Sequence, residues 1–65
     1  MLHRYLLADG SIEWIILDLL LEQPRSWGIG ELVDIIGSTV AVAEALDALH
    51  AAGIIKKIDA FVRIG

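Results

Sequence analysis

The fold is decided by residues 38–64, which read STVAVAEALDALHAAGIIKKIDAFVRI. Alanine and leucine, the strongest helix formers, dominate the first half of this stretch, and residues 40–52 contain neither proline nor glycine. Helical spacing gives the segment one apolar face, made of Val42, Ala45, Leu46 and Leu49. Ser38 and Thr39 are candidates for the N-cap, because a short hydroxyl side chain accepts a hydrogen bond from the first turn. We therefore predict a helix over residues 39–52.

A glycine stop and a β-hairpin follow this helix. Gly53 stands where a left-handed C-cap favours glycine. The branched and aromatic residues beyond it predict strands, and they are Ile54, Ile55, Ile58, Phe61, Val62 and Ile64. Asp59 and Ala60 mark the turn, although an Asp-Ala pair is a weak signal for a two-residue loop and a slightly longer loop fits as well. The pattern predicts a two-stranded hairpin over residues 54–64.

Two shorter helices precede this unit. Asp9-Gly10-Ser11 breaks the chain, Ser11 is a natural cap, and the helix that follows is expected over residues 12–22, before Gln23-Pro24 ends it. A second helix is expected over residues 29–36, with Gly28 and Gly30 weakening its first turn and Gly37 closing it.

These residues resemble the winged helix-turn-helix family of transcription regulators. The resemblance rests on Leu46, Leu49, Gly53, Ile54 and Ile55 followed by a basic pair and a hairpin, and upstream on Glu31-Leu32, Ile36 and the turn Gly37-Ser38. It covers Ser11 to Ile64 and implies an α+β, mostly α fold with three helices and a two-stranded wing. The expected organisation is a single winged-helix domain over residues 1–65, with an N-terminal arm at 1–10 and the helices and wing at 11–64.

Composition limits the function classes. The 65 residues contain no cysteine, so neither a disulfide nor a thiolate metal site can support so small a domain. Hydrophobic residues make up 57% of the chain, above the roughly 45–50% of ordinary soluble domains, which favours oligomerisation. The net charge of −4 argues against indiscriminate binding to nucleic acid or anionic membranes. His3-Arg4 interrupts the short apolar run at residues 1–8, so we expect no signal peptide and a cytoplasmic protein.

No catalytic, cofactor-binding or metal-binding residues are predicted. His3 and His50 lack the cysteine or suitably spaced carboxylate partners of a metal site. Each serine has an explanation as a helix cap or a loop residue. We therefore expect a protein that is not an enzyme and that has neither a cofactor nor a small-molecule substrate.

DNA binding is implied by the resemblance, because the family places its third helix in the major groove. The positions that would face DNA are Ser38, Thr39, Val40, Ala41, Glu44 and Asp47, and the chain has no Asn and a single Gln, Gln23. Asn and Gln, together with Arg and Lys, are the side chains that read guanine and adenine edges. The candidate DNA contacts are Ser38, Thr39 and the wing bases Lys56, Lys57 and Arg63, with Arg4 or Arg25 as additions. The alternative role of Lys56-Lys57 is protection of an edge strand.

The first helix suggests a protein partner instead. Its few polar residues leave an apolar arc of roughly 200°, twice that of an ordinary surface helix. The candidate interface residues are Trp14, Leu17 and Leu21 of this helix and Leu6 and Leu7 of the arm. For the two tryptophans, core or helix–loop packing is the first interpretation and an interface anchor is the second. An arm that folds back through Leu2, Tyr5, Leu6 and Leu7 is the alternative to a partner.

The sequence therefore favours a protein–protein interaction and dimerisation module that forms a homodimer or binds another protein. The alternative is a DNA-binding transcription regulator that contacts the phosphate backbone mainly through its wing.

Overall fold

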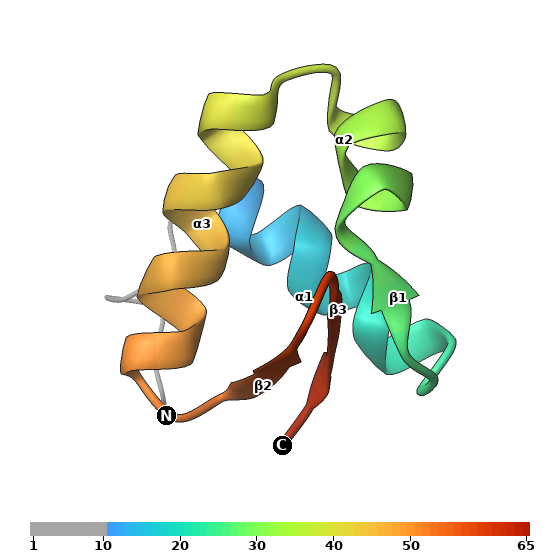
Figure 1. Ribbon diagram of the computed structural model, residues 1–65, viewed down its shortest axis with the longest axis vertical. Helices are drawn as coiled ribbons and strands as arrows, with labels where there is room; N and C mark the ends of the chain where they lie inside the picture. Colours follow the sequence, from blue (N-terminus) through green and yellow to red (C-terminus); the bar gives the residue numbers. More distant parts are fainter. Residues whose placement is uncertain (1–10) are drawn as a thin grey trace.

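The computed structural model describes residues 11–65, and this part of the chain holds three helices and a small antiparallel sheet (Figure 1). The helices are α1 (Ile12–Glu22), α2 (Ile29–Ile36) and α3 (Thr39–Ala51), and the strands are β1 (Trp27–Gly28), β2 (Ile55–Ile58) and β3 (Phe61–Ile64). The predicted α+β, mostly helical class is confirmed. The predicted bounds of α1 and α2 match, and α3 ends one residue before the predicted residue 52.

The prediction of a two-stranded sheet is wrong, because the sheet has three strands in the order β1-β3-β2. The additional strand, β1, pairs with β3 through Trp27 opposite Val62 and Gly28 opposite Phe61. The next residue, Ile29, extends this link by donating its N–H to the carbonyl of Ala60 at 2.9 Å. A two-residue strand is too short to show the alternation that identifies strands in a sequence.

The helix ends follow the predicted local chemistry. Ser11 Oγ accepts from the Trp14 N–H at 3.3 Å, and Ser38 Oγ accepts from the Ala41 N–H at 3.1 Å. At the other ends, Gly37 after α2 and Gly53 after α3 have φ of 89° and 77°. This left-handed backbone costs a side-chain-bearing residue about 1–2 kcal/mol, so glycine suits both positions.

The hairpin turn consists of Asp59 and Ala60, since Ile58 pairs directly with Phe61. Asp59 has φ of 55°, a left-handed conformation that Asp tolerates better than most residues. The tight turn fixes the register of β2 on β3, and opposite residues share a face of the sheet. Ile55 and Lys57 therefore face the core side with Ile64 and Val62, while the alternate residues face outward.

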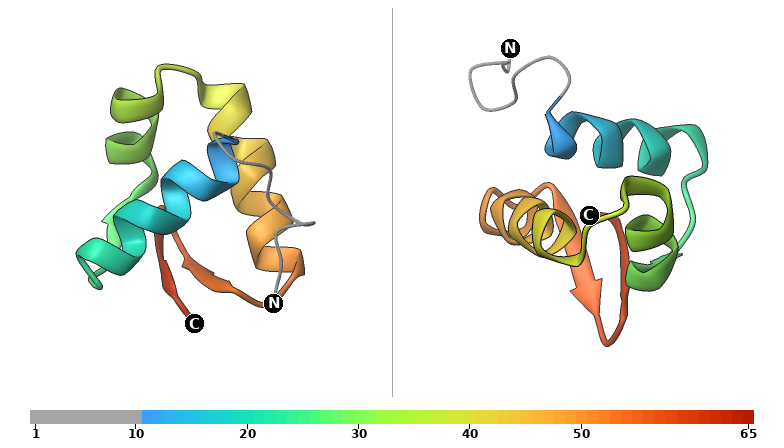
Figure 2. Two further views of the ribbon diagram at one scale, coloured as in Figure 1. Left: turned by 180° about the vertical axis from the view of Figure 1, so that it is seen from behind. Right: turned by 90° about the horizontal axis from the view of Figure 1, so that it is seen from above.

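The core lies where the three helices and the inner face of the sheet meet. It consists of Ile16, Leu20, Trp27, Leu32, Val42, Ala45, Leu46, Leu49, Ile55 and Val62. The view from above in Figure 2 shows α1 on one side of the fold and the tip of the hairpin projecting on the opposite side, with α2 and α3 between them. No helix within residues 11–65 has the length and apolar character needed to cross a bilayer.

Candidate functional site

The exposed face of α3 is acidic and made of small side chains. Its exposed residues are Thr39, Val40, Ala43, Glu44, Asp47, Ala48, His50 and Ala51. Val40 lies near the N-terminus of α3 and is 67% exposed. The Ser38 hydroxyl caps α3 by accepting from the Ala41 N–H. Of the residues that the sequence placed against DNA on this helix, Thr39 and Ser38 offer hydroxyl groups, whereas Glu44 and Asp47 offer negative charge.

Lys57, a predicted DNA contact, reaches back to α3. Its Nζ donates to Asp47 Oδ1 at 3.2 Å, and its side chain is 32% exposed. The cause is the hairpin register, which pairs Lys57 with the buried Val62 and so turns it toward the helices. The structure thus separates Lys57 from the other two predicted bases of the hairpin.

We call the outward side of the hairpin the ribbon outer face, and it consists of Lys56, Ile58, Phe61 and Arg63. Lys56 pairs with Arg63 and Ile58 pairs with Phe61, so two cations and two large apolar side chains lie side by side. Ile58 is 58% exposed and Phe61 is 52% exposed. Among residues 11–65, neither cation has an ion pair, since the two ion pairs of this part involve Arg25 and Lys57.

The Phe61 ring lies over Gly28 of the neighbouring strand. The two residues are paired across β1 and β3, and a Cβ added to Gly28 would lie 3.8 Å from the Phe61 ring. An aromatic ring covering a cross-strand glycine shields its backbone and stabilises the pair. The ring is therefore supported on one side by the sheet while more than half of the residue stays accessible.

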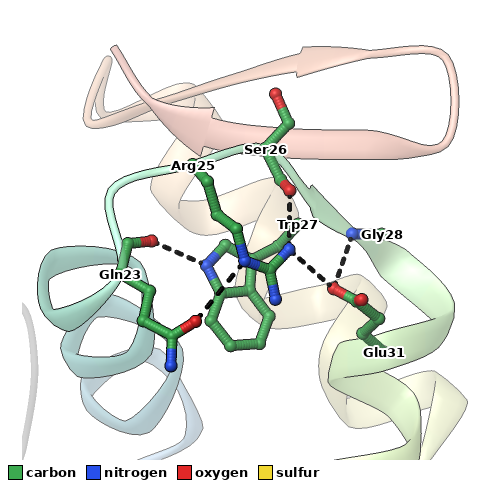
Figure 3. A network of polar contacts seen from close by, with 6 residues as sticks. All are labelled: Gln23, Arg25, Ser26, Trp27, Gly28 and Glu31. Atoms are coloured by element: carbon green, nitrogen blue, oxygen red, sulfur yellow. Dashed lines mark hydrogen bonds and ion pairs between the residues drawn. The ribbon is translucent and has the colours of Figure 1, made fainter.

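Arg25 belongs to a separate polar network around Trp27 (Figure 3). Its guanidinium lies 4.0 Å from the centroid of the indole and donates to Glu31 Oε1 at 3.2 Å and to the Ser26 carbonyl at 2.9 Å. Glu31 also accepts from the Gly28 N–H at 3.2 Å, and the indole N–H donates to the Gln23 carbonyl at 2.9 Å. Arg25 therefore connects the loop after α1 to the start of α2.

We call the outward side of α1 the α1 outward face, and it consists of Ile15, Asp18, Leu21 and Glu22. Ile15 is 38% exposed, Leu21 is 58% exposed, and both acids are exposed. Trp14 and Leu17, the other predicted interface residues of this helix, are half-buried and pack against the core cluster. Of the three predicted interface residues on α1, Leu21 presents the most surface. The predicted contacts Leu6 and Leu7, and the candidate base Arg4, lie outside the described residues.

Comparison with protein-family models, curated proteins and solved structures found no match to this chain. Within residues 11–65, no group of three or more His, Cys, Asp or Glu side chains is arranged to hold a metal ion.

Sequence reasoning missed the division of the hairpin bases between two faces. The signal was present in the period-two alternation of the strand, which places Ile55 and Lys57 on one face and Lys56 and Ile58 on the other. It assigns the bases of both strands to faces only once the turn length is known. A two-residue turn at Asp59-Ala60 places Lys56 opposite Arg63 and Lys57 opposite Val62. A loop one residue longer would have shifted the register by one residue and placed the side chains of one strand on the opposite face of the sheet.

Proposed function

We propose that this chain is a winged-helix protein–protein interaction module, architecturally similar to transcription regulators, that self-associates through α1 with the homodimer as its smallest assembly. The observation that carries the proposal is the exposure of two large aliphatic side chains, Ile15 at 38% and Leu21 at 58%, on the α1 outward face. Apolar patches of this kind on small proteins mark contact surfaces.

The energetics support an interface at this position. Burying a Leu or Ile side chain contributes about 1.5–3 kcal/mol, and a single core in a domain this small supplies roughly 3–5 kcal/mol in total. Because Ile15 and Leu21 are already partly buried, covering the rest of both contributes about as much as burying one such side chain, a substantial fraction of the stability of the isolated domain. Most oligomers of soluble proteins are assembled from copies of one chain, so a second copy is the commonest partner for such a surface.

The composition of α3 favours a protein partner over DNA. Residues 38–51 contain no Lys, Arg, Asn or Gln, the side chains that read guanine and adenine edges. The exposed carboxylates of Glu44 and Asp47 would face a phosphate backbone that carries one charge per about 1.7 Å.

A second candidate function is DNA binding through the hairpin, and the cross-strand pair of Lys56 and Arg63 favours it. Both cations lack an ion pair among the described residues and are available to phosphate. Phosphate contacts position a protein without reading sequence, so this candidate predicts weak, salt-sensitive binding with little specificity.

Sedimentation equilibrium from low to high micromolar concentration tests the proposed self-association. The wild-type mass should rise with concentration, whereas Leu21→Glu should remain a monomer with unchanged helicity by circular dichroism. Val40→Glu is the matched control, because it places the same charge at an exposed apolar position of α3. A monomeric wild type, or equal association of the two variants, would overturn the proposal.

A further inference from the structure

Two of the surfaces that combine exposed large apolar side chains with charge, the ribbon outer face and the α1 outward face, have opposite signs. The ribbon outer face combines Ile58 and Phe61 with two cations, and the α1 outward face combines Ile15 and Leu21 with two carboxylates. Each surface presents a pair of apolar groups beside a pair of like charges. Such surfaces are complementary in both hydrophobicity and potential.

A contact between two α1 outward faces lacks this complementarity. Residues 12–22 carry three acids and no base, so two copies of this helix facing each other bring Asp18 and Glu22 close to the same residues of the partner. Like charges opposed across an interface weaken it and select against that pairing. The same two acids would be neutralised by Lys56 and Arg63, which have no other ion pair within residues 11–65.

We propose that the ribbon outer face of one copy of this chain is the docking site for the α1 outward face of a second copy. This inference rests on the proposed self-association and names the surface that α1 contacts. In it, Leu21 and Ile15 cover Phe61 and Ile58, while Asp18 and Glu22 pair with Arg63 and Lys56. Gly28 supports the Phe61 ring from beneath, so that the apolar half of the site is present before docking.

The placement of the two surfaces determines the kind of assembly. α1 and the tip of the hairpin lie on opposite sides of the fold (Figure 2). A contact between α1 of one copy and the hairpin of another joins two different surfaces and is therefore heterologous, and it leaves one free surface at each end of a pair. Association is therefore head-to-tail, and the average mass exceeds that of a dimer as concentration rises.

Nucleic acid is the competing occupant of the ribbon outer face. A phosphate backbone would pair with Lys56 and Arg63 but would leave Ile58, an aliphatic side chain that is 58% exposed, in water. A second copy covers the charged and the apolar halves of the site together, which is why the observations favour it.

Charge-swapped variants test the inference. Lys56→Glu with Arg63→Glu gives a chain in which both surfaces are acidic, and Asp18→Lys with Glu22→Lys gives one in which both are basic. All four positions are exposed, so circular dichroism should match the wild type. Each variant alone should sediment as a monomer at concentrations where the wild type associates. An equimolar mixture should recover the wild-type mass distribution, because every basic surface again meets an acidic one.

Two results would overturn the inference in distinguishable ways. If the Lys56→Glu, Arg63→Glu variant associates like the wild type, the ribbon outer face is not the contact and α1 self-association stands without it. Loss of binding to a mixed-sequence DNA duplex by that same associating variant would assign the surface to nucleic acid. A wild type that remains monomeric at high micromolar concentration would remove both the inference and the proposed function.

Salt dependence of the wild type provides a second measurement that needs no variant. Raising NaCl from about 0.05 to about 0.5 M shortens the screening length severalfold. The head-to-tail contact joins opposite charges, so its association constant should fall. An α1-to-α1 dimer opposes like charges, so an association constant that rises with salt would contradict the inference.

Discussion

The exposed face of α3 and the ribbon outer face adjoin in sequence but differ in chemistry. α3 presents Glu44 and Asp47 among alanines, whereas the hairpin presents Lys56 and Arg63 beside two large apolar side chains. A protein that grips DNA with a recognition helix and a wing needs both surfaces to attract the same phosphate backbone. Here their charges are opposite, and Lys57, on the other side of the hairpin, forms an ion pair with Asp47 of α3 at 3.2 Å.

The difference shows that the fold and the binding properties of a chain depend on different residues and must be considered separately. The order of helices and strands follows from caps, glycines and apolar spacing, all of which concern buried or backbone groups. Binding is determined by the exposed residues, which can change while those constraints hold. Residues 38–51 contain no Lys, Arg, Asn or Gln, whereas the outer side of the hairpin carries two cations beside two large apolar side chains, a surface that we propose binds an acidic, apolar partner.

The largest effect is expected from a substitution in the hydrophobic core on which both regions pack. Trp27 is 5% exposed and pairs with Val62 of β3. This strand also carries Phe61 and Arg63 of the ribbon outer face. Trp27→Ala should lose about 3–5 kcal/mol, comparable with the whole stability of the domain. We expect its circular dichroism to show a largely unfolded chain at 25 °C.

Phe61→Ala is the control, because Phe61 is 52% exposed and its truncation should cost about 1 kcal/mol. If urea denaturation gave Trp27→Ala the stability of the wild type, the two regions would not depend on a common core.

A medium effect is expected at the junction between the two regions. Gly53 connects α3 to the hairpin with φ of 77°, and a Cβ there would meet no atom within 4 Å. Gly53→Ala should therefore cost about 1–2 kcal/mol through backbone strain alone. Gly30→Ala is the matched control, because a Cβ at Gly30 would also meet no atom within 4 Å. Gly30 lies inside α2, where alanine should stabilise the fold by about 0.5–1 kcal/mol. Equal changes of the same sign in urea midpoints would refute this interpretation of the junction.

The smallest effect concerns the ion pair between Asp47 of α3 and Lys57 of the hairpin. Asp47 has a side chain that is 74% exposed, so its coupling to Lys57 should be below about 1 kcal/mol and should weaken with salt. A double-mutant cycle with Asp47→Ala and Lys57→Ala measures this coupling in urea denaturation. A coupling of several kcal/mol would mean that the pair fixes the hairpin on α3 instead of neutralising Lys57.

Much of the fold could be predicted because its determinants are local. Ser11 and Ser38 cap helices, and Gly37 and Gly53 end them, as expected from residue type alone. Strand β1 could not be predicted, because its two residues are held by pairing with β3, a contact distant in sequence. Distant pairings leave no local pattern.

The candidate site was less predictable for the same reason. Lys57 was grouped with Lys56 and Arg63 by proximity in sequence, but the register turns it toward Asp47. Arg25 was a candidate base, but its stacking on Trp27 and its pairing with Glu31 depend on how the loop after α1 meets α2. Trp14 and Leu17 are candidate interface residues, with core packing the first interpretation for Trp14, and both are half-buried against the core. Each outcome required knowledge of tertiary placement.

The central claim, that α3 does not read DNA, is tested most directly by selection from a randomised duplex pool at about 0.15 M salt, the physiological range. Fluorescence anisotropy then measures the affinity for enriched duplexes. The Glu44→Lys, Asp47→Lys variant is a positive comparator, because two added cations should raise non-specific affinity on the order of tenfold at low salt. For the wild type, we predict no enriched sequence and no effect of Thr39→Ala on the weak residual binding. Sub-micromolar binding to an enriched sequence that is lost on Thr39→Ala would contradict the claim.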